Sequence, residues 1–131
     1  MKKHIACVLV LLLLMNCAAC GGSKASETAT AVGIQAVSIL DEYLDGSKSY
    51  VAVCVVIDSL YAQMEYAYDY EDLESPTAKQ EADKAILFQL LYCKSILSAD
   101  GFEIPPETYN TVAIIRNNIA EIIGVEARQF P

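Results

Sequence analysis

The stretch YVAVCVVI, residues 50–57, decides between two fold classes. Its many β-branched residues suit a buried strand. A lone strand, however, leaves its backbone N–H and C=O groups without hydrogen bonds, and no other part of the chain offers a second strand to pair with it. Val53 and Ile57 also begin an apolar spacing that continues in helical phase through Leu60 and Met64. The stretch is therefore predicted to be helical.

Three other segments have apolar residues at the same helical spacing. The first begins at Glu27 and is stopped by Asp45 and Gly46, because glycine accepts the left-handed conformation that follows many helices. The third begins with Ser75 as N-cap and Pro76 in the first turn. The four apolar stripes are Val32, Ala36, Leu40 and Tyr43; Val53, Ile57, Leu60, Met64 and Ala67; Ala82, Ile86, Leu90, Cys93 and Leu97; and Tyr109, Val112, Ile115, Ile119 and Ile122.

The ends of the last two segments complete the architecture. Asp100 and Gly101 stop the third segment, Pro105 and Pro106 open the fourth, and Gly124 stops it. Four helices joined by short connections are typical of an up-down-up-down bundle. We therefore predict an all-α fold, a small antiparallel four-helix bundle over residues 27–131.

The start of the chain has the pattern of a cleaved signal peptide. Lys2, Lys3 and His4 precede an unbroken apolar run, residues 5–15, and small residues follow at 16–19. The stretch from residue 5 to residue 19 is shorter than the roughly 20 apolar residues that a spanning helix needs. We therefore predict removal of residues 1–19.

The residues at the cleavage position, Cys17-Ala18-Ala19-Cys20, resemble the lipobox of bacterial lipoproteins, in which a small-residue triplet precedes a cysteine that becomes lipidated. The resemblance covers residues 1–23 and implies a lipid on Cys20 that holds the protein in the membrane. The family usually has Leu, Val or Ile where Cys17 stands. The alternative is secretion with a free Cys20. Small and polar residues follow, so that residues 20–26 are expected to form the lipidated cysteine and a flexible tether.

The charge of the chain limits its partners. The 131 residues contain nine Lys or Arg, of which Lys2 and Lys3 leave with the leader, and seventeen Asp or Glu. A mature domain of net charge −10 lacks the basic footprint that nucleic-acid binding requires. An anionic lipid surface would repel it as well. The expected partners are the membrane, through the lipid on Cys20, and a basic envelope protein.

The inventory of reactive side chains argues against catalysis. His4 is the only histidine and belongs to the leader, which removes histidine-based metal, haem and nucleophile sites from the mature domain. No glycine-rich phosphate loop and no EF-hand spacing occurs. We therefore expect no enzyme activity, no metal site and no cofactor. The remaining catalytic hypothesis is an enzyme that uses carboxylates alone.

Two cysteines of the mature chain, Cys54 and Cys93, are predicted to come level on the second and third helices. A disulfide between them is compatible with a location outside the cytoplasm. Against it, helix axes usually lie 8–10 Å apart, whereas a disulfide needs Cα atoms within about 7 Å. Two buried thiols that pack as small apolar residues are the alternative.

A segment rich in tyrosine and acidic residues ends the second helix. Tyrosine is enriched at interfaces, and negative charge is unfavourable at a helix C-terminus, so a basic partner would compensate it. The alternative is a solvated helix end. The candidate interaction residues are Tyr66, Tyr68, Asp69, Tyr70, Glu71 and Asp72.

Together these features predict a lipid-anchored protein on the outer side of a bacterial membrane that acts by binding other proteins, as an accessory or protective lipoprotein. A carrier that holds a small apolar ligand between its helices is the alternative.

Overall fold

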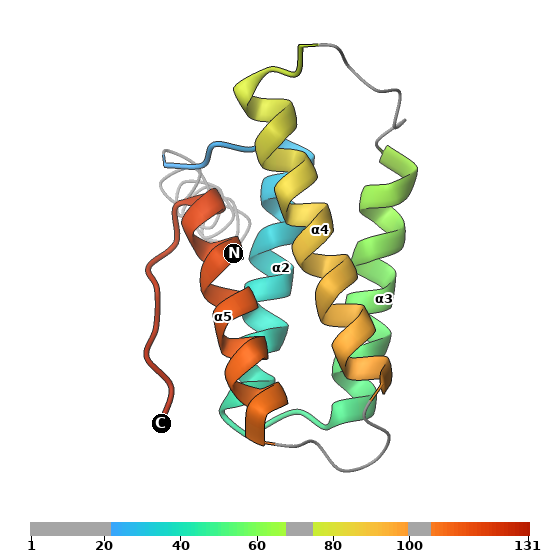
Figure 1. Ribbon diagram of the computed structural model, residues 1–131, viewed down its shortest axis with the longest axis vertical. Helices are drawn as coiled ribbons and strands as arrows, with labels where there is room; N and C mark the ends of the chain where they lie inside the picture. Colours follow the sequence, from blue (N-terminus) through green and yellow to red (C-terminus); the bar gives the residue numbers. More distant parts are fainter. Residues whose placement is uncertain (1–21, 68–74, 100–105) are drawn as a thin grey trace, which may run out of the picture.

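The computed structural model describes residues 22–67, 75–99 and 106–131, and within these ranges it is entirely helical apart from turns and extended ends. The helices run alternately up and down, side by side (Figure 1). This arrangement confirms the predicted all-α antiparallel four-helix bundle. The helices are α2 (Glu27–Leu44), α3 (Tyr50–Ala67), α4 (Ala78–Ala99) and α5 (Pro106–Ile123).

The stretch 50–57 forms the first two turns of α3. Val53 and Ile57 are fully buried, whereas Val51 is 60% exposed and Val55 is 64% exposed. In a strand, these four alternate residues would all lie on one face. Their division between core and solvent follows from the helical period, so the prediction of a helix is confirmed.

The core lies between all four helices. α2 and α4 each pack against both α3 and α5, and α2 makes only a minor contact with α4 across the bundle. Gly33 permits a close approach of α2 to α5, because a Cβ at this position would come within 2.7 Å of Cγ2 of Ile123. The largest fully buried side chains are Leu40, Ile57, Leu60, Met64, Ile86, Leu90, Leu97, Ile115, Ile119 and Ile123.

Two of the predicted helix stops are confirmed by left-handed glycines. Gly46 has φ +79° and follows α2, and Gly124 has φ +75° and follows α5. The start of α4 differs from the prediction, which placed the N-cap at Ser75. Thr77 caps this helix instead: its Oγ1 accepts a hydrogen bond from the backbone N–H of Gln80 at 3.2 Å, and the Gln80 side chain accepts one from the Thr77 N–H at 2.8 Å. This reciprocal pair is a capping box.

The N-terminal part of the chain is described from Gly22 onward, so the predicted signal peptide (residues 1–19) and Cys20 lie outside the described residues. Residues 22–26 differ from the flexible tether that their composition suggests. Ala25 is buried, and Ser26 caps α2 by accepting a hydrogen bond from the Ala29 N–H at 3.2 Å. This segment is therefore part of the folded domain.

Across the described ranges, no helix has both the length and the apolar composition that crossing a membrane requires.

Candidate functional site

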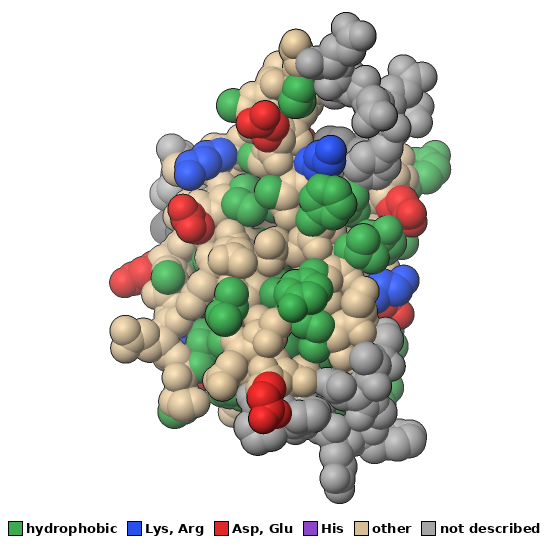
Figure 2. Space-filling model, viewed as in Figure 1, with side chains coloured by type: hydrophobic (Ala, Val, Ile, Leu, Met, Phe, Trp, Pro, Cys, Tyr) green, Lys and Arg blue, Asp and Glu red, His purple; other side chains and the backbone are tan. Residues whose placement is uncertain are grey.

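The outward side of α4 exposes three large hydrophobic side chains. Phe88 is 51% exposed, Leu91 39% and Tyr92 54%. Leu91 and Tyr92 lie three and four residues after Phe88, so all three residues share the side of the helix that faces away from the core. Figure 2 shows hydrophobic side chains gathered near the middle of the molecular face that α4 crosses. We refer to Phe88, Leu91 and Tyr92 as the α4 face.

Polar side chains border the α4 face. On the α3 side, the ammonium of Lys94 lies 3.8 Å from the carboxylate of Asp58. On the α5 side, the Asn118 amide donates a hydrogen bond to the Gln89 side chain at 3.3 Å. Toward the start of α4, the ammonium nitrogen of Lys84 lies 5.7 Å from the centroid of the Phe88 ring. An apolar centre with a polar rim is the usual composition of a protein interface.

Sequence reasoning did not single out the α4 face. The signal was present, because Phe88, Leu91 and Tyr92 are apolar but lie off the buried stripe of Ile86 and Leu90. A helix with apolar residues on its core side needs no others on its opposite side. Core packing therefore does not account for the apolar residues of the α4 face, and their presence indicates a contact surface.

Cys54 and Cys93 lie on the adjacent helices α3 and α4, and both are free thiols in the structure. Cys93 is fully buried, and Cys54 is half-buried at the edge of the core. Burial, with a smaller contribution from the neighbouring Cys54, raises the pKa of Cys93 to about 12. At neutral pH the Cys93 thiol is therefore protonated and a poor nucleophile. A disulfide between the two residues stays a prediction.

We expect an alkylating reagent to distinguish these two thiols in the reduced native protein. Cys54 should react first, whereas Cys93 should react only after unfolding, because burial keeps it protonated and out of contact with the reagent. Peptide-resolved mass spectrometry measures both rates, and equal rates in the folded protein would contradict the packing of Cys93. Labelling of denatured, unreduced protein then counts the thiols: two free thiols from this pair rule out the disulfide.

The tyrosine-rich acidic segment is described only in part. Tyr66 lies in the last turn of α3 and is 95% exposed, so its ring is available for contact. The remaining candidates, Tyr68, Asp69, Tyr70, Glu71 and Asp72, lie outside the described residues. The last turn of α3 and the first turns of α2 and α4 lie at one end of the bundle (Figure 1). Tyr66 therefore lies at the same end as residue 26.

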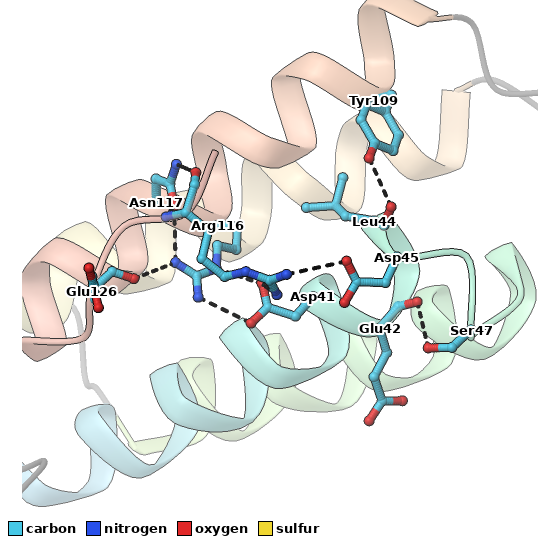
Figure 3. Close-up of polar contacts among 10 residues, drawn as sticks. Asp41, Glu42, Leu44, Asp45, Ser47, Tyr109, Arg116, Asn117 and Glu126 are labelled. Atoms are coloured by element: carbon cyan, nitrogen blue, oxygen red, sulfur yellow. Dashed lines mark hydrogen bonds and ion pairs between the residues drawn. The ribbon is translucent and has the colours of Figure 1, made fainter. Parts of the chain in front are cut away.

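A charged network joins α2 to α5 and to the C-terminal segment, residues 125–131 (Figure 3). Arg116, which is only 2% exposed, donates two hydrogen bonds to the Asp41 carboxylate, from Nε at 2.7 Å and from Nη2 at 3.1 Å. Its Nη1 donates to the Glu126 carbonyl at 2.8 Å and to the Asn117 side chain at 3.0 Å. Arg128 lies 3.3 Å from the same Asp41 carboxylate.

The bonding of this network indicates a structural role. The Arg116 guanidinium is held by partners on every nitrogen, and its bidentate pairing with Asp41 is the geometry that arginine and carboxylate prefer. Asn117 holds the C-terminal segment by donating to the Arg128 carbonyl at 2.7 Å. These groups are engaged with one another, which leaves them unsuited to acid–base chemistry on a substrate. In the part of the chain that the structure describes, no group of three or more His, Cys, Asp or Glu side chains could hold a metal ion.

Comparisons of the chain with protein-family models, with curated proteins and with solved structures find no match.

Proposed function

We propose that this protein is a lipid-anchored component of the bacterial cell envelope that acts by binding another protein, and that the α4 face is its contact surface. The lipid on Cys20 attaches it to the extracytoplasmic side of the membrane. It carries out no catalysis of its own. The observation that carries the proposal is the exposure of Phe88, Leu91 and Tyr92 together on one side of α4.

The energetics of exposed apolar groups support the choice of surface. Contiguous apolar patches on a soluble domain commonly mark interaction sites, because removing them from water is favourable by roughly 25 cal/mol per Å². Aromatic side chains such as Phe88 and Tyr92 supply large contact areas with few rotatable bonds. Interface energy is often concentrated in such residues. The α4 face therefore has the chemistry of a contact centre.

The net charge supports a basic partner. The chain from residue 20 carries a formal charge of −10, which favours association with positively charged proteins and repels anionic lipid headgroups. The acidic residues that follow Tyr66 in the sequence, Asp69, Glu71 and Asp72, contribute to this negative charge. Charge supplies attraction over a distance, and the α4 face supplies apolar area.

A crosslinking experiment in the native cells tests the proposed contact surface. We expect the double variant Phe88→Ser and Tyr92→Ser to lower recovery of the crosslinked partner by about tenfold or more, which corresponds to about 1.4 kcal/mol of binding free energy. The matched control is Val55→Ser, which replaces a residue that is 64% exposed on the outward side of α3. Circular dichroism verifies that all variants remain helical.

The outcomes separate the two functional classes. Loss of the partner from the α4 variant but not from Val55→Ser supports the proposal. Equal recovery from both variants would contradict the α4 face as the contact surface. Recovery of a bound lipid or other apolar molecule, with no specific protein, would favour the ligand carrier. Nothing in the packing of the described core favours that function over protein binding.

A further inference from the structure

Residues 22–26 are joined to the end of α5 through the backbone. The N–H of Lys24 donates a hydrogen bond to the carbonyl of Ile122 at 3.0 Å. Gly22 lies directly against Gly124, because a Cβ on Gly124 would come within 2.7 Å of the backbone carbonyl carbon of Gly22. Two glycines at this crossing allow the chains to approach more closely than side chains would permit. The segment is thus fixed to the C-terminal end of α5.

The same segment is joined to α2 and α4. The hydroxyls of Ser23 and Thr30 are hydrogen-bonded at 2.7 Å, and Thr30 is buried within α2. The N–H of Ser26 donates to the carboxylate of Asp83 on α4 at 2.8 Å, and Asp83 is only 3% exposed. Ala25 is buried between these contacts. Three helices therefore hold residues 22–26, so the chain enters the bundle at a fixed point and in a fixed direction.

The fixed point lies very close to the proposed lipid attachment. Two chain steps separate Cys20 from Gly22, which span at most about 7 Å when fully extended. This covalent limit keeps residue 20 within about 7 Å of the point where the chain is fixed to the bundle. For comparison, the six residues 21–26 would have allowed about 20 Å as a free extended tether.

We propose that residues 22–26 form a rigid mount that holds the bundle upright on the lipid surface. The proposal rests on the proposed lipidation of Cys20. The end of the bundle that meets the membrane comprises the starts of α2 and α4 and the ends of α3 and α5 (Figure 1). The loop between α2 and α3 lies at the opposite end, about 27 Å away along an 18-residue helix.

An upright bundle places the α4 face at a defined height. Phe88 and Tyr92 follow Ala78, the first residue of α4, by ten and fourteen positions. At 1.5 Å per residue these positions lie about 15 and 21 Å along the helix from its membrane end. In this orientation the α4 face points sideways, along the membrane plane. It would meet a partner whose binding surface lies at the same height above the membrane.

Fluorescence quenching measures the orientation. The full-length lipidated protein, purified from its membranes, is placed in phosphatidylethanolamine–phosphatidylglycerol vesicles that contain lipids with a nitroxide headgroup. An azide-bearing amino acid replaces either Lys79 or Lys48 and carries the fluorophore. Lys79 lies in the first turn of α4, and Lys48 lies in the loop between α2 and α3; both are exposed. We expect quenching at position 79 to exceed that at position 48 by at least about threefold, because a helix length of about 27 Å separates the two ends.

A linker variant tests whether the short connection causes the orientation. About twelve Gly and Ser residues inserted between Cys20 and Gly21 leave the contacts of residues 22–26 intact but add a flexible connection of about 20 Å. We expect the ratio of quenching at the two positions to fall below about 1.5 in this variant, because the domain can then tumble. The matched control carries the same linker after Pro131, and its ratio should equal that of the unmodified protein.

The outcomes separate this proposal from the one on which it rests. Equal quenching at positions 79 and 48 in protein whose intact mass includes the lipid would overturn the rigid mount alone. The same holds if the linker between Cys20 and Gly21 leaves the ratio unchanged. An intact mass without lipid would overturn the proposed anchoring and the mount together. Hydrogen exchange gives an independent reading: the Lys24 amide should be protected, and an unprotected amide would contradict the bond to Ile122.

Discussion

Replacing Arg116 with leucine is expected to lower the free energy of unfolding by about 3 kcal/mol. The substitution leaves the Asp41 carboxylate, whose side chain is 22% exposed, without its two shortest hydrogen bonds, and it leaves the Glu126 carbonyl without its partner. Removing one member of a buried ion pair is strongly destabilising, because the remaining charge stays desolvated. The effect stands at the lower end of the usual range because Arg128 remains 3.3 Å from Asp41.

Urea denaturation of the variant measures this effect, and two further variants interpret it. Lys48→Ala removes an exposed pair, in which the ammonium lies 3.6 Å from the Glu42 carboxylate, and should cost no more than about 1 kcal/mol. Replacing Arg116 and Asp41 together with leucine should cost less than Arg116→Leu alone, because no unpaired charge is left behind. If Arg116→Leu is no more destabilising than Lys48→Ala, the network does not hold α2 to α5.

Replacing Ile57 with alanine is the second substitution with a large expected effect, about 3 kcal/mol of unfolding free energy. The fully buried side chain loses its apolar contacts and leaves a cavity that the surrounding helices fill only in part. Val55→Ala, two residues earlier, removes a side chain that is 64% exposed. Its effect should lie within about 0.5 kcal/mol, since it creates no cavity and alanine favours the helix.

The contrast between these two substitutions tests the interpretation of residues 50–57. A helix separates positions 55 and 57 by about 200°, which places one in solvent and the other in the core. A strand would place both on the same face and predict similar losses. Thermal or urea unfolding of the two variants gives the comparison, and equal destabilisation would contradict the helical register of α3.

Much of the fold was predictable from local features of the sequence. The buried stripe of α3 follows from periodicity as far as Met64, whereas Ala67, predicted to continue it, is exposed at the end of the helix. The stops at Gly46 and Gly124 follow from the backbone freedom of glycine. The start of α4 was misplaced by two residues because Ser75 and Pro76 match a helix start, while Thr77 and Gln80 provide two reciprocal hydrogen bonds at the actual one. Local rules therefore locate helices better than they locate their ends.

The tertiary contacts were not predictable in the same way. Asp41 and Arg116 are 75 positions apart, and each alone resembles a solvated charge beside an apolar stripe. Residues 22–26 are small and polar, which is the composition of a flexible linker, yet their backbone bonds to α5 and α4 fix them. Backbone hydrogen bonds of this kind leave no trace in composition. The α4 face was detectable in principle, as apolar residues outside the core stripe.

These contacts connect the two proposals. Residues 22–26, which follow the proposed lipid attachment at Cys20, are hydrogen-bonded to the bundle, so under the two proposals the fold would set the position of the α4 face relative to the membrane. A partner would then meet Phe88 and Tyr92 at a constant height, which reduces the orientational search that precedes binding.

The intact mass of the protein recovered from its native membrane tests the proposed lipid anchor. We predict a polypeptide that begins at Cys20, with the added mass of a lipid on that residue. A chain that retains residues 1–19, or one that begins at Cys20 with an unmodified thiol, would contradict it.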